Sequence, residues 1–181
     1  MKWFIASDIH GSAYWCKAML EKFSEEKADR ILLLGDILYH GPRNDLPQEY
    51  APKEVIAMLS KMKDSILSVR GNCDCEVDQM VLPFPVLSDY TVLDIGKRLI
   101  FATHGHLFGS EHPLPMKKGD ILLSGHTHVP RCEEKDGLLF LNPGSVSIPK
   151  EGSVHGYMTL ENGVFLWKDL ESGKIYNECR L

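Results

Sequence analysis

The first half of the chain alternates between continuous apolar runs and runs with a helical period. Three short apolar runs have the length of buried strands, and they cover residues 2–7, 31–34 and 65–69. After the first run, Trp15, Met19 and Phe23 recur every four residues behind Ser12, which predicts a helix with Ser12 as its N-cap. Residues 51–63 repeat apolar positions in the same way. Strands that alternate with helices at these lengths predict a sheet covered by helices.

Strand patterns dominate the second half. Turn sequences such as "DG" at 136–137 and "ENG" at 161–163 separate several of them and indicate antiparallel hairpins. No linker divides the chain, so we expect one domain over residues 1–181. The expected class is α/β, with two mixed sheets packed face to face and helices outside. The predicted strands cover residues 86–95, 99–103, 121–124, 138–141, 155–160 and 164–168.

Five of the apolar runs end in side chains that can bind metal ions. Taken singly, each ending also fits an ordinary turn, because Asp, Asn and Gly are common in surface loops. In an open α/β sheet, however, ligands bind at the carboxyl ends of the strands, so five such endings favour one shared site. The residues are Asp8 and His10, Asp36, Asn72, His104, and His126 with His128.

This donor set suits a pair of transition-metal ions. A dinuclear site needs a carboxylate that bridges two cations about 3.5–4 Å apart. Carboxylate and amide oxygens mixed with neutral imidazoles favour Mn²⁺, Fe or Zn²⁺ over Ca²⁺ or Mg²⁺. The spacing of His126 and His128 lets one short loop reach two neighbouring ions.

Net charge and cysteine content limit the classes of binding partner and the cellular compartment that we expect. The net charge is −5 and no Lys/Arg cluster occurs, which argues against stable binding to nucleic acid. A small phosphate ester remains compatible, because bound metal supplies positive charge. The apolar segment near the N-terminus is too short for a signal peptide or a membrane span. Five cysteines without a framework spacing indicate a reducing compartment, so we expect a cytoplasmic protein without membrane contact.

The ordered motifs "D-x-H", "GD", "GN-x-D", "H-G-H" and "GHTH" resemble those of the calcineurin-like metallophosphoesterases. The resemblance covers almost the whole chain, and the blocks "RGNCD", "THGHLFG" and "NPGSVSIPK" are closest to small bacterial phosphodiesterases of that family. It implies a four-layer α/β–β/α sandwich and a phosphoric diester hydrolase with two divalent ions per chain, Mn²⁺ being our choice. It further implies that one metal takes Asp8, His10, Asp36 and His128, and that the other takes Asp36, Asn72, His104 and His126.

The implied mechanism is hydrolysis by a hydroxide that the two cations activate for in-line attack on phosphorus. One position departs from the family pattern. Many relatives carry, after the Asn, a His that protonates the leaving group, and here Cys73 stands in that place. A thiol is a poor general acid, so we expect weak monoesterase activity and a preference for diesters with good leaving groups, such as aryl esters.

Further candidates surround these motifs. His106 is either a substitute acid and substrate contact or a residue that orients the ligands. Arg43 is either a contact to the substrate phosphate or a surface residue of a Pro-rich loop. Asp74 is a candidate for hydrogen bonding within the catalytic site or to a neighbouring loop. Ser145 in "NPGS" is expected to form a structural turn.

Several alternatives stay open. A retromer subunit shares the implied architecture yet serves as a scaffold for protein interaction, although the seven filled ligand positions favour an enzyme. A nuclease fits the acidic chain poorly, and a monoesterase fits the missing His poorly. The expected partner is a small phosphodiester. A homo-oligomer is also open, with Phe84, Tyr90 and Phe108 as loop aromatics that an interface can use.

Overall fold

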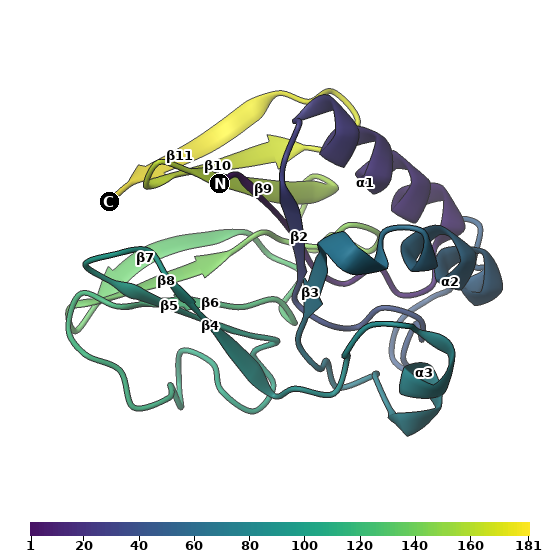
Figure 1. The fold of residues 1–181 in the computed structure, drawn as a ribbon, viewed down its shortest axis with the longest axis horizontal. Coiled ribbons are helices and arrows are strands. Elements are labelled where there is room, and N and C mark those ends of the chain that lie inside the picture. Colours follow the sequence, from purple (N-terminus) through teal and green to yellow (C-terminus); the bar gives the residue numbers. More distant parts are fainter.

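The computed structural model describes all residues from 1 to 181, and its frame is two mixed β-sheets (Figure 1). The six-stranded sheet has the order β11-β10-β9-β1-β2-β3. Within it, β1, β2 and β3 are parallel, and β9 pairs antiparallel with β1. Its strands are β1 (Trp3–Ala6), β2 (Arg30–Leu33), β3 (Ile66–Ser68), β9 (Gly156–Glu161), β10 (Val164–Asp169) and β11 (Ile175–Arg180).

The five-stranded sheet has the order β4-β5-β6-β8-β7. Its three central strands, β5, β6 and β8, are parallel, while β4 and β7 pair antiparallel on the two edges. Its strands are β4 (Tyr90–Asp94), β5 (Leu99–Thr103), β6 (Ile121–Leu123), β7 (Arg131–Lys135) and β8 (Leu138–Asn142). The expected pair of mixed sheets is therefore present.

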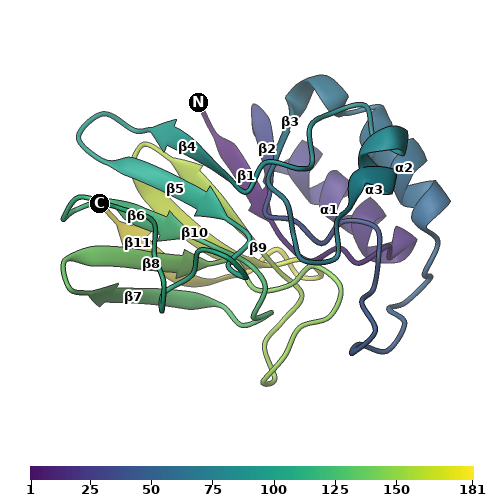
Figure 2. The same cartoon turned by 90° about the horizontal axis from the view of Figure 1, so that it is seen from below.

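Helices α1 (Ala13–Glu25) and α2 (Pro52–Ser60) pack on the outer face of the six-stranded sheet, and the short helix α3 (Glu76–Val81) lies beside α2 (Figures 1 and 2). As predicted, Ser12 caps α1, because its hydroxyl oxygen accepts a hydrogen bond from the Trp15 N–H at 3.2 Å. Pro52 occupies the first turn of α2, where its missing N–H costs nothing. No helix lies in the chain after α3, so the five-stranded sheet has no helix layer of its own. The α/β class and the two mixed sheets are as expected, but the outer helix layer that the resemblance implied for this second sheet is absent.

The continuous apolar strands of the first half are buried on both faces. Phe4 and Ile31 pack with α1 and α2, in a core that also contains Trp15 and Val55. The alternate residue Ile5 faces the other way and joins the core between the two sheets, which contains Leu32, Ile100, Ile121, Leu123 and Leu141. Burial on both faces explains why these strands read as apolar runs without alternation.

The sequence patterns missed three elements. Strands β7 and β11 are polar and almost fully exposed edge strands that pair with β8 and β10, and the short helix α3 has no buried residue. The strand expected at 86–95 begins only at Tyr90.

Phe84 is only 4% exposed, so the idea that it contributes to an interface is wrong. All five cysteines are free, and no helix has the length and apolarity that crossing a membrane requires.

Candidate metal centre

The topology brings the ends of parallel strands from both sheets to one rim. The loops after β1, β2 and β3 carry Asp8 and His10, Asp36, and Asn72, and these three strands are neighbours. The loops after β5 and β6, neighbours in the other sheet, carry His104 and the pair His126 and His128. The seven ligands predicted from the sequence therefore meet, as the rule for parallel strands requires.

Two glycines, which lack a Cβ atom, allow these loops to come into contact. A Cβ on Gly35 would stand 2.4 Å from the backbone nitrogen of Gly71, so the loops of Asp36 and Asn72 pack backbone to backbone. A Cβ on Gly125 would stand 1.9 Å from Ser7 Oγ, which is where the loop after β6 meets the loop after β1. Neither approach is sterically possible for a larger residue.

Half of the ten non-glycine residues with positive φ angles are predicted ligands. These five ligands adopt φ angles between 49° and 68°, a region that non-glycine residues rarely occupy. Strain of this kind persists only where the surrounding structure imposes it, and it is typical of functional sites. The five are Asp8, His10, Asp36, His126 and His128.

Backbone carbonyls orient three of the histidines. The Nδ1 atoms of His10, His104 and His128 lie 2.7, 2.6 and 2.6 Å from the carbonyl oxygens of Tyr39, Leu34 and Ile148, respectively. Each Nδ1 must carry the proton that it donates, so Nε2 is the nitrogen that faces the centre and, in the neutral imidazole, offers a lone pair to a metal. This is how proteins prepare imidazoles for a metal.

The candidate donor atoms lie close to one another in the centre. His10 Nε2 lies 3.2 Å from His128 Nε2, and His104 Nε2 lies 3.2 Å from His126 Nδ1 and 3.1 Å from Asn72 Oδ1. Asp36 Oδ2 stands between the two groups, 3.7 Å from His10 Nε2 and 3.4 Å from His104 Nε2.

Asp8 Oδ1 is fully buried and has no hydrogen-bond donor. An unpartnered buried carboxylate oxygen is costly, and a cation removes that cost. The residues therefore fit divalent metal ions.

In the absence of cations, protonated imidazoles balance the two buried carboxylates. Burial alone would raise the pKa of Asp8, but the adjacent imidazoles of His10 and His128 hold that pKa well below its usual range. Burial likewise opposes the shift at Asp36, whose pKa is lowered chiefly by His104. The pKa of His104 rises to about 9, because hydrogen bonding to Asp36 outweighs the effect of burial.

Asp74 lies beneath this centre and holds its loops. Its carboxylate is 7% exposed and accepts three backbone N–H bonds, from Asp36 and Gly71 at 2.8 Å each and from Ile37 at 2.9 Å. Burial and the charge of Asp36 raise the pKa of Asp74 to about 6, although these bonds oppose the rise. Asp74 thus contacts the backbone of a ligand and does not line the cavity above the ligands.

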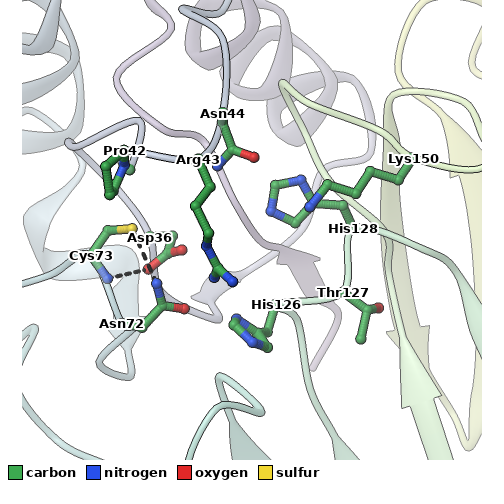
Figure 3. Close-up of a pocket in the computed structure, with 11 residues that line it drawn as sticks. Asp36, Pro42, Arg43, Asn44, Asn72, Cys73, His126, Thr127, His128 and Lys150 are labelled. Atoms are coloured by element: carbon green, nitrogen blue, oxygen red, sulfur yellow. Dashed lines mark hydrogen bonds between the residues drawn. The ribbon is translucent and has the colours of Figure 1, made fainter.

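A cavity of about 390 Å³ opens above the ligands (Figure 3). Asp36, Asn72, His126 and His128 form part of its floor, and Arg43 and Lys150 point into it from different loops. Arg43 is thus brought to the site. Lys150 was not singled out from the sequence, although it ends the block "NPGSVSIPK"; its neighbours in the cavity, Asn44 and Thr127, had no signal of their own.

Cys73 and His106 line different cavities. Cys73 lines the cavity; burial and the nearby Asp36 carboxylate raise the pKa of its thiol to about 12. His106 packs its ring on His104 and His126, with centroids 5.3 and 6.2 Å apart, and lines a different cavity. Burial, together with the charges of His104 and His126, lowers the pKa of His106.

The "NPGS" turn holds the first ligand loop. Ser145 and Ser147 each donate a hydroxyl hydrogen bond of 3.0 Å to the carbonyl oxygen of Asp8. Ser145 Oγ also accepts the N–H groups of Ser147 and Ile148, at 3.2 and 2.9 Å. These contacts are those of a structural turn, as the sequence suggested.

Comparison with known proteins places the chain in a family. Residues 1–163 match the model of the calcineurin-like phosphoesterase superfamily domain. The chain is 46% identical over 164 residues to phosphodiesterase YfcE of Escherichia coli strain K12. The aligned residues cover 91% of this chain and 89% of the relative.

Solved structures agree with this relation. The structure of YfcE, described as a phosphoesterase from E. coli, superposes with a TM-score of 0.96 at 43% identity over 99% of both chains. Vacuolar protein sorting 29 from Cryptosporidium parvum, at 23% identity and a TM-score of 0.62 over 99% of this chain and 98% of its own, shares the fold alone. The expected fold class is confirmed, and the chain belongs to the calcineurin-like phosphoesterase superfamily.

Proposed function

We propose that the protein hydrolyses small phosphodiesters at a centre of two divalent cations. The observation that carries the proposal is the completeness of the donor set: two buried carboxylates, an amide oxygen and four imidazoles face one centre, and Asp8 Oδ1 lacks any donor. The expectation of a phosphoric diester hydrolase is confirmed at the level of the family and of its named relative, phosphodiesterase YfcE.

The contacts support two ligand groups that share Asp36. Asp8 Oδ1 lies 3.6 Å from His10 Nε2 and 3.3 Å from His128 Nε2, which favours one ion among these residues and Asp36. Asn72, His104 and His126 would hold the second ion with Asp36. We propose Mn²⁺ for both, because hard oxygens and imidazoles occur together. When bound, the cations would lower the pKa of a water for in-line attack on phosphorus and offset the charge of the phosphate oxygens.

The chain's own residues bind and orient the substrate. Arg43 and Lys150 face the cavity from two loops, and their charges would bind the non-bridging oxygens of the diester. Asp74 is a positioning residue, because it holds the backbone of Asp36. His106 packs its ring on His104 and lines a different cavity from Arg43 and Lys150, so we assign it the orienting role against His104 and not that of a proton donor.

The weak acidity of Cys73 favours diesters with good leaving groups. The raised pKa of Cys73 keeps its thiol protonated and makes it a very weak acid, so the residue that stands in place of the family's His does not readily supply a proton to an alkoxide. An aryl oxide leaves without one. We therefore expect aryl diesters to be favoured over alkyl diesters and monoesters.

The test is hydrolysis of bis(p-nitrophenyl) phosphate against p-nitrophenyl phosphate. Metal-stripped protein is supplied with Mn²⁺, and Asp36→Asn serves as the control. Metal-dependent cleavage of the diester that exceeds cleavage of the monoester and disappears in the variant is the expected result. No turnover of either ester despite bound Mn²⁺ would support the alternative, a scaffold for protein interaction, which the complete donor set does not favour. Whether the chain forms a homo-oligomer stays a prediction.

A further inference from the structure

A second cavity, which is apolar, lies next to the metal pocket. It has a volume of about 430 Å³ and opens between α2, α3 and the loop after β2. We call it the aryl groove and define it by Tyr39, Tyr50, Ile56, Cys73, Val77 and Val81.

The aryl groove and the metal pocket share a wall. Cys73 lines both cavities, and its Sγ lies within 4.8 Å of the ligand atoms of His10 and Asp36. Tyr39 also lines the groove, and its carbonyl oxygen accepts the 2.7 Å hydrogen bond from His10 Nδ1. Four residues later in the same loop, Arg43 lines the metal pocket. A group in the groove is therefore only one side chain away from the centre.

The groove leaves apolar surface exposed. Val77 is 65% exposed, Val81 45% and Tyr39 42%, and all three residues line the groove. Val77 and Val81 are four residues apart on α3 and so lie on one side of that helix. Exposed apolar side chains that line a concave surface are typical of a binding site.

The groove selects for uncharged groups. Asp78 is its only charged lining residue, and its carboxylate already accepts the Cys75 N–H at 2.8 Å. No cation lines it, in contrast to the metal pocket with Arg43 and Lys150. The phosphate therefore belongs in the metal pocket, and a neutral ring of the same substrate fits the groove.

We propose that the aryl groove binds the aromatic leaving group of the phosphodiester. This inference rests on the proposed function. In the step that it serves, water oxygen forms the new bond to phosphorus and its proton goes to solvent. The bond from phosphorus to the aryl oxygen breaks with both electrons on that oxygen. The ring held behind Cys73 then departs as an aryl oxide that needs no proton.

The experiment compares two methyl phosphodiesters whose leaving alcohols have matched acidity, one a substituted phenol and the other a fluorinated alkanol. With Mn²⁺ present, the wild-type protein should hydrolyse the aryl ester with a kcat/KM about 10–100-fold higher, because only the ring fills the groove. The double variant Val77→Ser/Val81→Ser should lose about tenfold on the aryl ester and less than about twofold on the alkyl ester.

The matched control is Met80→Ser on the same helix. Met80 is 83% exposed and does not line the groove, so both esters should be hydrolysed as by the wild type. Thermal unfolding verifies that both variants fold.

Equal rates on the two esters in the wild type, or equal losses on both in the double variant, would overturn the inference while leaving the phosphodiesterase intact. The inference would also be overturned if the double variant had a different sedimentation coefficient from the wild type but the same ester preference. That result would show the groove to be an interface between copies of the chain. No hydrolysis of either ester by the wild type would refute the proposed function itself, and the inference with it.

Discussion

Metal binding should become tighter as pH rises, because His104 must lose a proton first. In the metal-free protein, the pKa of His104 is about 9. Burial alone would lower this pKa, but the nearby carboxylates, Asp36 foremost, raise it by more than burial lowers it. A metal binds only the neutral imidazole. Below this pKa, each unit of pH should therefore change the affinity for Mn²⁺ about tenfold, which is about 1.4 kcal/mol.

The sign follows from the direction of the shift. The metal-free protein holds the proton below about pH 9 and releases it on binding, so affinity rises from about pH 7 to 9 and then levels off. About one proton should leave per protein at about pH 8. His10, whose pKa is also raised although burial opposes the rise, adds to the release at lower pH.

Titration calorimetry of the metal-stripped protein with Mn²⁺ measures both quantities, when it is run in buffers with different ionisation enthalpies. Deprotonation of a bound water would increase with pH, whereas release from His104 must decline above about pH 9, so the two sources are separable. The exposed His112 offers a matched control, since His112→Gln should leave the curve unchanged. A dissociation constant that is the same at about pH 7 and 9 would refute the reasoning.

Three further perturbations have definite outcomes. Glu26 contacts Lys2, Lys168 and Tyr157, which lower its pKa to about 2 although burial opposes this. Glu26→Gln should therefore cost about 1–2 kcal/mol in urea denaturation at neutral pH, and the difference should fade as pH falls from about 4.5 to 2; a difference independent of pH would contradict the ion pairs. Asp74→Asn leaves at least one backbone N–H without its acceptor, so unfolding should become easier by about 1–3 kcal/mol and Mn²⁺ affinity should drop about 10–100-fold. Unchanged Mn²⁺ affinity in that variant would show that Asp74 does not position Asp36. Arg43→Ala should lower kcat/KM for the diester about 10–100-fold, with partial recovery in Arg43→Lys, and no loss would place the guanidinium outside the phosphate contacts.

The sequence predicted the helices and strands that carry a clear apolar periodicity or capping residue. Helix α1 and its Ser12 cap were predicted because apolar periodicity and capping are local properties. Strands β7 and β11 were missed because "RCEEK" and "IYNECR" have no apolar face, and they are strands because β8 and β10 supply their hydrogen bonds. Context of this kind overrides propensity in edge strands.

The candidate site divides in a similar way. The seven candidate metal ligands could be picked out because residue type and position after a strand mark them, and the structure brings them together. Lys150 was missed because its place in the cavity depends on how the loop after β8 folds over the site. The contact of Asp74 with the backbone of Asp36 spans 38 residues, so no local pattern can reveal it.

The sequence by itself determined the class of the fold, the donor set of the metal centre and the family, because apolar period, residue chemistry and motif order are properties of the chain. Only the tertiary structure decided which imidazole nitrogen faces the centre, that Asp8 Oδ1 has no donor, and that Cys73 separates a charged pocket from an apolar groove. These features depend on distances between segments far apart in the chain. Those distances are set when two sheets pack and glycine loops close to within van der Waals contact.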